Sequence, residues 1–416
     1  MMPRLFLSLL FLCSTTIIAT KDDIQRVFKG VLIADQRSGL ILLTRDLDGD
    51  GNANGEDETI TFFNDSSITN VFTLHATRDN YVFAGDGTTD TVYRLKDTDD
   101  DGIADDIKVW FSEADNYNNY TLPTPNSVYY KYNDYNDDNG ALYILNAGTG
   151  DRPGDYIYRT VDLNGDGDAN DEGEATKWMD LQTILQDLMP EGAAASSAFE
   201  LVFLGDTAFI SDSNGGKPLI LAARDSNKNG VIESNEAYVL IDENNPFNVQ
   251  LFWALTGNEK NNELYVAGGF GNLIITRLLL NAIEADEARN MNNDRMKIDS
   301  IDQIQSVWES SLAPTGTFGN NFAIAVANEA GLFVTSNGSE KENNIFRMID
   351  LDGDGKFYSE GETIIWKSGA PILQRPRNVE PYYKYVPVTT SGGSITKLTT
   401  SFVTAVLLCF FILEMK

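Results

Sequence analysis

Short hydrophobic runs separated by polar turns recur along the chain. In TVYRLKD (residues 91–97) apolar and polar side chains alternate with a period of two, and GVLIAD (30–35) and LILLTRD (40–46) are rich in branched aliphatic residues. This pattern predicts β-strands over most of the length.

Two stretches depart from the strand pattern and favour short helices. Apolar side chains follow helical spacing between Leu181 and Leu188, and Pro190 then ends the run. A helix is therefore predicted from Asp180 to Leu188. A second helix is expected near Ile283 to Asn290.

One phrase recurs: a strand, a turn, a second strand that ends in Asp, an Asp/Gly loop and a third strand. The first copy reads GVLIAD, LILLTRD, LDGDG, ETITFF, and the last reads GLFVTSNG, NIFRMID, LDGDG, ETIIWKS. Successive loop glycines lie roughly 60 residues apart, except that the last gap is about twice as long. These glycines are Gly51, Gly102, Gly167, Gly230 and Gly355. A sixth unit without the loop is therefore expected between Glu263 and Ser310, where ELYVAGG, LIITRLLL and QSVWES supply strands.

A fourth strand precedes the phrase in several units, as in NVFTLHAT (70–77) and AFELVFL (198–204). Four antiparallel strands in each of six units predict an all-β fold, a six-bladed β-propeller over residues 21–386. One blade cannot bury both of its faces alone, so neighbouring blades must stack. A pair of β-sandwiches or a β-solenoid is the alternative.

The fourth loop has the clearest spacing for a cation site. Its Asp225, Asn227, Asn229 and Glu236 occupy positions 1, 3, 5 and 12 of a calcium loop, and Gly230 occupies position 6. Alternate side chains then point at one ion, and the Glu closes the shell. Hard oxygen donors suit Ca²⁺ better than zinc or copper. Because the flanking residues are strand-like, we expect a calcium-binding loop between the outer strands of a blade.

Four further loops share this chemistry, and in three of them the Glu stands at position 13. The predicted ligands are Asp46, Asp48, Asp50 and Glu58 in the first loop, Asp162, Asn164, Asp166 and Glu174 in the third, and Asp350, Asp352, Asp354 and Glu362 in the sixth. The shorter second loop offers Asp97, Asp99, Asp101 and Asp105. Asx-turns with solvated acids are the alternative, but five such loops crowd carboxylates whose repulsion a cation would offset. The similar stretch NDYNDDNG (133–140) is expected to be a turn within a hairpin.

The charge of the chain narrows its possible functions. Its 62 acidic and 31 basic residues give a net charge of -31, which repels nucleic acid and gathers cations. The only histidine, His75, lies on a predicted inner strand, where a packed or partly exposed position is expected. With both cysteines, Cys13 and Cys409, in the end segments, a zinc cluster is excluded. No catalytic residue is predicted, although catalysis by a carboxylate pair stays open.

The N-terminal segment predicts secretion. Arg4 is followed by the apolar run Leu5 to Cys13, which is typical of a signal peptide over residues 1–20. Three glycosylation sequons fit a secreted protein, at Asn64, Asn119 and Asn337.

The C-terminal segment predicts a membrane attachment. After a polar linker (387–400) comes a hydrophobic tail (401–416) with the apolar run Phe402 to Leu413. The tail is either a lipid-anchor signal or a short membrane span.

The strand and Asp-loop phrase resembles secreted six-bladed propellers of the quinoprotein dehydrogenase-like class. The similarity covers most of residues 24–368 and rests on the blade pattern and the DxDxDG loops; no His-bearing catalytic motif accompanies them. The signal peptide, the acidic ectodomain with GVLIADQ and VWFSEAD, and the hydrophobic tail resemble the acidic skeletal organic matrix proteins of stony corals. That second resemblance implies a role in calcium carbonate deposition.

These observations lead to one functional hypothesis and two alternatives. We expect a non-enzymatic, extracellular, calcium-binding protein that acts as a skeletal or mineral matrix component. Its partners would be calcium ions and calcium carbonate mineral or matrix proteins, with the membrane contacted through the tail. The alternatives are a calcium-dependent propeller hydrolase, of phosphoesterase or lactonase type, and a cell-surface adhesion module.

Overall fold

The computed structural model describes most of the chain between its two end segments. The described residues are 24–132, 134, 140–148, 155–191, 196–242, 244, 254–268, 273–280, 298, 301–312, 323–327, 330–337, 343–369 and 372–387. Phe28–Lys384 form one compact unit. The described residues outside that unit, 24–27 and 385–387, belong to its first and last strands.

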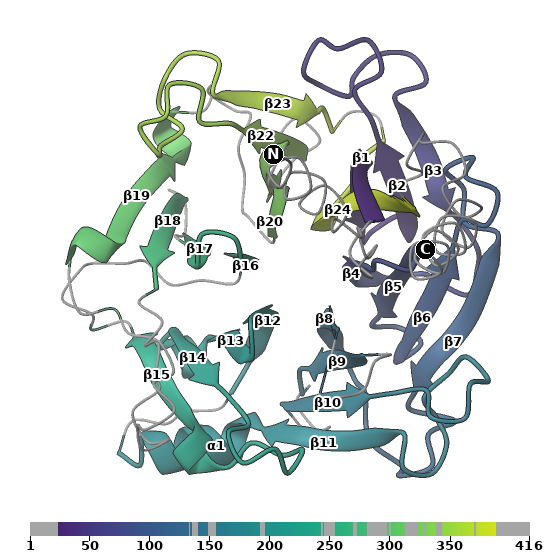
Figure 1. Cartoon of the computed structure of the whole chain (residues 1–416), viewed down its shortest axis with the longest axis vertical. Coiled ribbons are helices and arrows are strands. Elements are labelled where there is room, and N and C mark those ends of the chain that lie inside the picture. Colours follow the sequence, from purple (N-terminus) through teal and green to yellow (C-terminus); the bar gives the residue numbers. More distant parts are fainter. Residues whose placement is uncertain are drawn as a thin grey trace, which may run out of the picture. The chain divides into compact units, whose positions relative to one another are not determined.

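Six four-stranded antiparallel sheets surround a common centre, which confirms the predicted six-bladed β-propeller (Figure 1). In five blades the strands follow chain order from the centre outward. The unit expected without an Asp loop between Glu263 and Ser310 is confirmed as part of blade five.

Each blade runs from an innermost strand at the centre of the ring to an outermost strand at the rim. Blade one is β24 (Pro376–Pro387), β1 (Ile24–Asp35), β2 (Leu40–Thr44) and β3 (Thr59–Phe63). Blade two is β4 (Val71–Ala76), β5 (Tyr81–Asp86), β6 (Thr91–Lys96) and β7 (Asp106–Ser112). Blade three is β8 (Pro125–Lys131), β9 (Ala141–Asn146), β10 (Tyr156–Thr160) and β11 (Ala175–Asp180). Blade four is β12 (Ala198–Leu204), β13 (Thr207–Asp212), β14 (Leu219–Ala223) and β15 (Ala237–Asp242). Blade five is β16 (Ala254–Asn258), β17 (Glu263–Gly268), β18 (Ile274–Leu279) and β19 (Ile304–Glu309). Blade six is β20 (Ile324–Ala327), β21 (Gly331–Ser336), β22 (Asn344–Met348) and β23 (Thr363–Lys367).

Blade one is completed by strands from opposite ends of the chain. β24 is its innermost strand and lies beside β1. The repeat pattern does not reveal this pairing, because most of the sequence separates the two strands. The pairing closes the ring, since blades one and six cannot part without breaking a sheet.

Large aromatic side chains of the outer strands fill the space between blades. Trp366 on β23 is fully buried, and its Nε1–H donates to Thr44 Oγ1 of the next blade at 2.9 Å. Trp110 on β7 repeats this bond to Thr160 of blade three, also at 2.9 Å. Each such ring removes on the order of 150–250 Å² from water. The core therefore lies in the layers between blades.

Buried aspartates at the ends of second strands hold the connections that lead into the innermost strands. Asp86 Oδ2 accepts the backbone N–H groups of Thr69 and Asn70 at 2.6 and 2.7 Å, just before β4. Asp35 and Asp212 bind the equivalent connections in blades one and four. Part of the acidity of the chain is thus structural.

The helix predicted from Asp180 to Leu188 is confirmed. α1 spans Leu181–Leu188, and the Asp180 side chain caps it by accepting the N–H of Thr183. None of the helices among the described residues has the length and apolar character to cross a membrane. The predicted signal peptide, tail and second helix lie outside the described residues, as do the linker apart from Pro387 and the 133–140 stretch apart from Asp134 and Gly140.

Candidate metal centres

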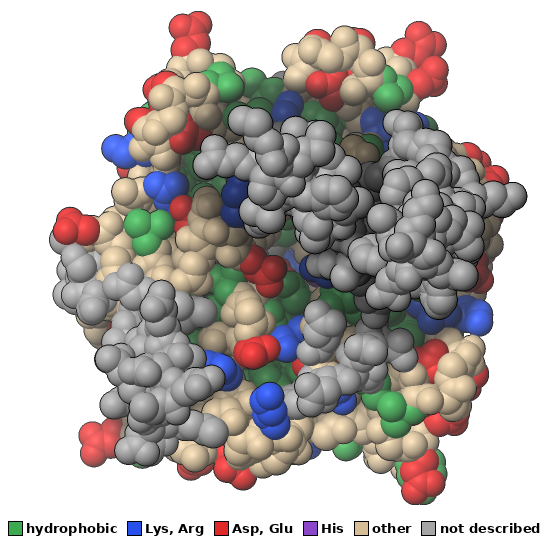
Figure 2. All heavy atoms as spheres, viewed as in Figure 1, with side chains coloured by type: hydrophobic (Ala, Val, Ile, Leu, Met, Phe, Trp, Pro, Cys, Tyr) green, Lys and Arg blue, Asp and Glu red, His purple; other side chains and the backbone are tan. Residues whose placement is uncertain are grey.

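The five Asp-rich loops occupy the same place in five blades. Each joins the third strand to the outermost strand, as predicted: β2–β3, β6–β7, β10–β11, β14–β15 and β22–β23. The loops lie toward the rim of the ring in Figure 1, and Figure 2 shows acidic side chains at separate points along that rim.

A fixed set of hydrogen bonds shapes the first loop. Asp46 accepts the backbone N–H of Gly49 through Oδ1 at 2.7 Å and that of Gly51 through Oδ2 at 3.0 Å. Asp48 accepts the N–H of Asp50 at 3.0 Å, and Asp50 accepts that of the residue two positions later at 2.9 Å. Positions 1, 3 and 5 thereby turn their side chains toward the inside of the loop.

The other four loops repeat these bonds. Position 1 binds the N–H groups of positions 4 and 6 in the second, third and sixth loops. In the fourth loop Asp225 binds positions 5 and 6 instead. Positions 3 and 5 each bind the N–H two residues later in every loop.

This geometry gathers the predicted ligands into tight oxygen clusters. In three loops, one carboxylate oxygen from each of three aspartates lies within 4.8 Å of the others. The clusters are Asp46, Asp48 and Asp50; Asp97, Asp99 and Asp101; and Asp350, Asp352 and Asp354. In the third and fourth loops, asparagines bring amide oxygens to equivalent positions: Asn164, Asn227 and Asn229.

The predicted glutamate ligands are engaged with the backbone of their own loops. Glu58 is buried, and its carboxylate accepts the N–H groups of Leu47 at 2.7 Å and Gly55 at 2.6 Å. Although burial opposes its ionisation, these backbone donors hold the pKa of Glu58 below its ordinary value. Glu174, Glu236 and Glu362 make the same two-sided contact. Each glutamate thus ties the start of its loop to the last turn, and ligation would require it to turn from these donors.

Asp105 takes the part of the glutamate in the shorter second loop. Its Oδ1 accepts the backbone N–H of Thr98 at 3.0 Å, and its Oδ2 accepts the Thr98 hydroxyl at 2.5 Å.

The position-6 glycines share one backbone requirement, a φ between 79° and 98°. That left-handed region penalises any side chain, which explains Gly51 and its four counterparts.

Each loop also bonds to the neighbouring blade. The backbone N–H at position 8 donates to a carbonyl on the outermost strand of the preceding blade. The pairs are Ala53 to Trp366 (2.7 Å), Ala104 to Phe62 (2.7 Å), Ala169 to Trp110 (2.8 Å), Ile232 to Trp178 (2.6 Å) and Phe357 to Val307 (2.9 Å). Arg347 of blade six adds a bond from Nη1 to the Gly51 carbonyl at 3.1 Å. The conformation of a loop is thereby coupled to an interface between blades.

A second group of titratable residues lies on the innermost strands. His75 on β4 has Nδ1 3.4 Å from Glu380 Oε1 on β24, and its ring centroid lies 4.7 Å from that of Tyr129 on β8. Glu200 on β12 accepts the Ser127 hydroxyl at 2.5 Å. The expectation for His75, a packed inner-strand residue, is confirmed, but its acidic neighbours were not predicted.

Burial sets the protonation of these inner groups. It raises the pKa of Glu200 and of Glu380 to about 8 and lowers that of His75 to about 4. Burial also lowers the pKa of Arg377 to about 10, while the charge of Glu200 opposes that shift. At neutral pH the two carboxyl groups are therefore mainly protonated and the imidazole is neutral. The sequence signal that could have revealed these two groups is a single glutamate inside each of the mainly apolar runs AFELVFL and RNVEPYYKYV.

The three sequon asparagines differ in exposure. Asn64 and Asn119 are exposed, and Asn119 adopts a left-handed backbone conformation. The side chain of Asn337 is buried. Glycosylation at these positions stays a prediction.

No protein-family model and no curated protein sequence matches this chain. Solved structures are similar to it in fold. A chain of a nidogen/laminin complex has 12% identity and a TM-score of 0.48, covering 84% of this chain and 97% of that one. An aldose sugar dehydrogenase from Streptomyces coelicolor has 12% identity and a TM-score of 0.44, with coverages of 86% and 89%. A gluconolactonase from Xanthomonas campestris has 13% identity and a TM-score of 0.42, with coverages of 73% and 77%. Because these likenesses concern the backbone alone, we infer the function of this chain from its own residues.

Proposed function

We propose that this chain is a non-enzymatic, extracellular calcium-binding β-propeller that serves as a component of a mineral-associated organic matrix. The observation that carries the proposal is the repetition of one oxygen-lined loop in five blades, each bonded to the preceding blade. Because the same hydrogen bonds recur in every copy, we expect one function for all five loops. The side-chain oxygens that they gather suit one class of ion.

The donor set fits Ca²⁺. The side chains at positions 1, 3 and 5 offer only oxygen, and calcium takes six to eight oxygen ligands, including backbone carbonyls and waters. In the first loop the ion would be held by Asp46, Asp48 and Asp50, and the carbonyl of Asn52 at position 7 stands where such loops add a further donor. Softer metals favour sulfur and imidazole, which these loops lack.

Electrostatics supports the same ion. Three carboxylates with oxygens within 4.8 Å repel one another, and a divalent cation offsets that repulsion. The net charge of -31 adds a long-range field that raises the local cation concentration. Ions bound only to the folded state would stabilise the loops and, through the position-8 bonds, the interfaces between blades.

The matrix role is tested by adsorption to calcium carbonate crystals. We expect the purified protein to adsorb saturably and to slow crystal growth, because an acidic surface binds the calcium ions of the mineral face. An unrelated acidic protein of similar net charge per residue serves as the control. Adsorption no stronger than that control, with unchanged growth, would rule out the matrix role while leaving calcium binding intact.

A second candidate function, a propeller hydrolase, is favoured by the inner cluster, the group formed by His75, Glu200 and Glu380 on the innermost strands. Glu380, which lies 3.4 Å from His75, and Glu200, both partly buried, have pKa values of about 8 and could move protons near neutral pH. Turnover of lactones or phosphate esters by the protein, abolished in Glu380→Gln, would favour this function. Absence of turnover across both substrate classes would leave the matrix proposal as the better account.

A further inference from the structure

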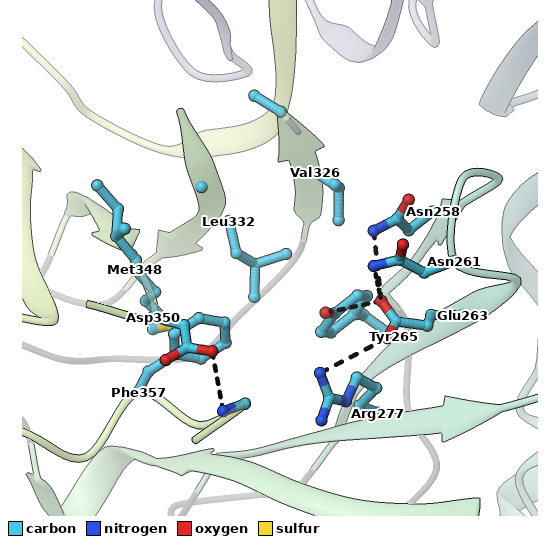
Figure 3. A pocket seen from close by; sticks show the side chains of 14 residues that line it. Asn258, Asn261, Glu263, Tyr265, Arg277, Val326, Leu332, Met348, Asp350 and Phe357 are labelled. Carbon is cyan, nitrogen blue, oxygen red and sulfur yellow. Dashed lines mark hydrogen bonds and ion pairs between the residues drawn. The ribbon is translucent and has the colours of Figure 1, made fainter. Parts of the chain in front are cut away.

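A cleft of about 270 Å³ lies between blades five and six (Figure 3). One wall belongs to blade five and is polar, with side chains from β17, β18 and the β16–β17 turn. The other belongs to blade six and is mainly apolar, formed by Val326, Leu332, Met348 and Phe357. The volume is just below the range of roughly 300–1,000 Å³ of pockets for drug-sized ligands, so a smaller ligand fits.

The polar wall is organised around Glu263. Its Oε2 accepts from Asn258 Nδ2 at 3.3 Å and Asn261 Nδ2 at 3.2 Å, and from the Tyr265 hydroxyl at 3.3 Å. Arg277 Nη1 lies 3.6 Å from Oε1 of the same carboxylate. Glu263 is the first residue of β17. At the equivalent position, the second strands of the other five blades carry Gly, Tyr, Ala or Thr. This carboxylate is therefore a feature of blade five alone among them.

Two buried atoms of this wall have no hydrogen-bond partner, Asn258 Oδ1 and Arg277 Nε. In blade three, Arg159 occupies the place of Arg277 on the third strand, and its Nε bonds Asp134 at 2.5 Å. That aspartate also accepts the hydroxyl of Tyr143. The internal repeat thus supplies an acceptor in blade three that blade five lacks, and an unmade hydrogen bond at a buried group costs about 1–3 kcal/mol.

The charges of the cleft select the class of ligand. Glu263 and Arg277 offset each other, so neither an anion nor a cation gains a net partner on the polar wall. Asp350 at the edge of the cleft is already bonded to Gly353 and Gly355. A hydroxyl group can exchange hydrogen bonds with the amide, carboxylate and guanidinium groups of Asn261, Glu263 and Arg277 that line the cleft, and a carbon ring face can pack on Leu332 and Phe357.

We propose that this cleft binds a neutral, polyhydroxylated unit the size of one sugar ring, either as a free sugar or as the end of a glycan. The polar wall recognises its hydroxyl groups and the blade-six wall packs against its apolar face. The site is separate from the inner cluster, but it shares Asp350 and Phe357 with the sixth Asp-rich loop, so binding is measured with that loop supplied with calcium.

The test is a titration of the whole protein, with calcium in excess, against four neutral probes: the methyl glycosides of glucose, galactose, mannose and N-acetylglucosamine. Binding is followed by ligand-observed NMR and calorimetry. Glucuronate and glucosamine are the charged counterparts, and the corresponding free sugars and oligosaccharides separate the two sources of the unit. Glu263→Gln keeps the shape of the side chain, and Asn261→Ala changes an exposed residue, so both variants should fold. Lys260→Ala, on the same turn but outside the lining, is the matched control.

We expect saturable binding of at least one neutral probe, weaker by at least about tenfold in both Glu263→Gln and Asn261→Ala and unchanged in Lys260→Ala. Melting curves in the absence of probe confirm that the variants are folded. The proposal is overturned if no neutral probe binds saturably, if a charged counterpart binds more tightly, or if the two cleft variants bind as the wild type does.

Discussion

At the scale of single residues, backbone strain explains the position-6 glycines. Gly230 has a φ of 85°, and a Cβ added there would meet nothing within 4 Å. Any effect of a side chain at this position therefore comes from the backbone and not from a clash. Lys228, two residues earlier, adopts a φ of 58° and carries the same kind of strain.

Gly230→Ala is expected to lower the free energy of unfolding by about 1–2 kcal/mol, because a left-handed conformation costs that much for an L-residue. Lys228→Gly is expected to raise it by up to about 1 kcal/mol. Urea denaturation at fixed calcium measures both. A Gly230→Ala variant as stable as the wild type would show that the loop does not need the positive φ.

The inner carboxyl groups make a pH prediction. Glu200 and Glu380 have pKa values of about 8 in the folded state, against an ordinary value of 4.5. The folded state therefore holds extra protons between these values, and the stability that they contribute is lost as the pH rises toward 8. His75, lowered from 6.5 to about 4, acts in the opposite sense below 6.5.

At saturating calcium, the free energy of unfolding should therefore fall from pH 7 to pH 8, where the two carboxyl groups outweigh the remaining titration of His75 in the unfolded chain. Arg377 and Tyr129, which surround them, do not titrate in this window, since their pKa values are about 10 or higher. Glu380→Gln, which keeps the acid form's shape, should flatten the decline. A wild-type profile that rises over this range would contradict the assigned protonation.

At the scale of the element, the carboxylates of each loop have two separate roles. Aspartates at positions 1, 3 and 5 gather oxygens for the ion, whereas the late glutamate holds the loop backbone. Asn164 and Asn227 occupy position 3 in two loops and keep its hydrogen bond. Position 3 can therefore lose its charge without losing the loop geometry.

Asp48→Asn is expected to weaken calcium binding in the first loop by at least about tenfold without lowering the stability of the calcium-free protein. Glu58→Gln should do the reverse and destabilise the calcium-free protein by about 1–3 kcal/mol, because its single amide oxygen cannot replace both charged oxygens that accept from Leu47 and Gly55. Calorimetric titration and denaturation without calcium separate the two effects. If Glu58→Gln abolished calcium binding but left the stability of the calcium-free protein unchanged, the glutamate would be a ligand and not a brace.

The position-8 amides report the coupling between loop and blade interface. Hydrogen exchange at Ala53, Ala104, Ala169, Ile232 and Phe357 should accelerate when calcium is chelated, because a loosened loop releases the bond to the preceding blade. Amides in the middle of second strands, such as that of Ala84, are the internal control. If the five amides were equally protected with and without chelator, the conformation of the loops would not be coupled to the interfaces between blades.

At the scale of the whole molecule, the sequence predicted the blades and the loops because both recur. Strand alternation and the spacing of Gly51 and its counterparts are local signals that repetition reinforces. The β24–β1 pairing could not be read, since it joins strands from opposite ends of the chain. The position-8 bonds are made by backbone atoms and leave no side-chain signature.

The inner cluster could also not be predicted from the sequence. Glu200 and Glu380 are single acids in apolar strands, and only ring closure shows that burial governs both. The late glutamates were predicted as ligands from their spacing alone, and the bonds that Glu58 makes to the loop backbone give that spacing a second physical reason.

The most direct test of the account is the calcium stoichiometry of the purified protein, measured by calorimetric titration together with its melting temperature. We predict five saturable sites and a melting temperature that falls on chelation, since each ion at a hundred times its Kd adds about 2.7 kcal/mol. Removal of calcium that leaves the melting temperature unchanged, or binding that never saturates, would contradict the claim that five loops hold discrete ions and brace the blades.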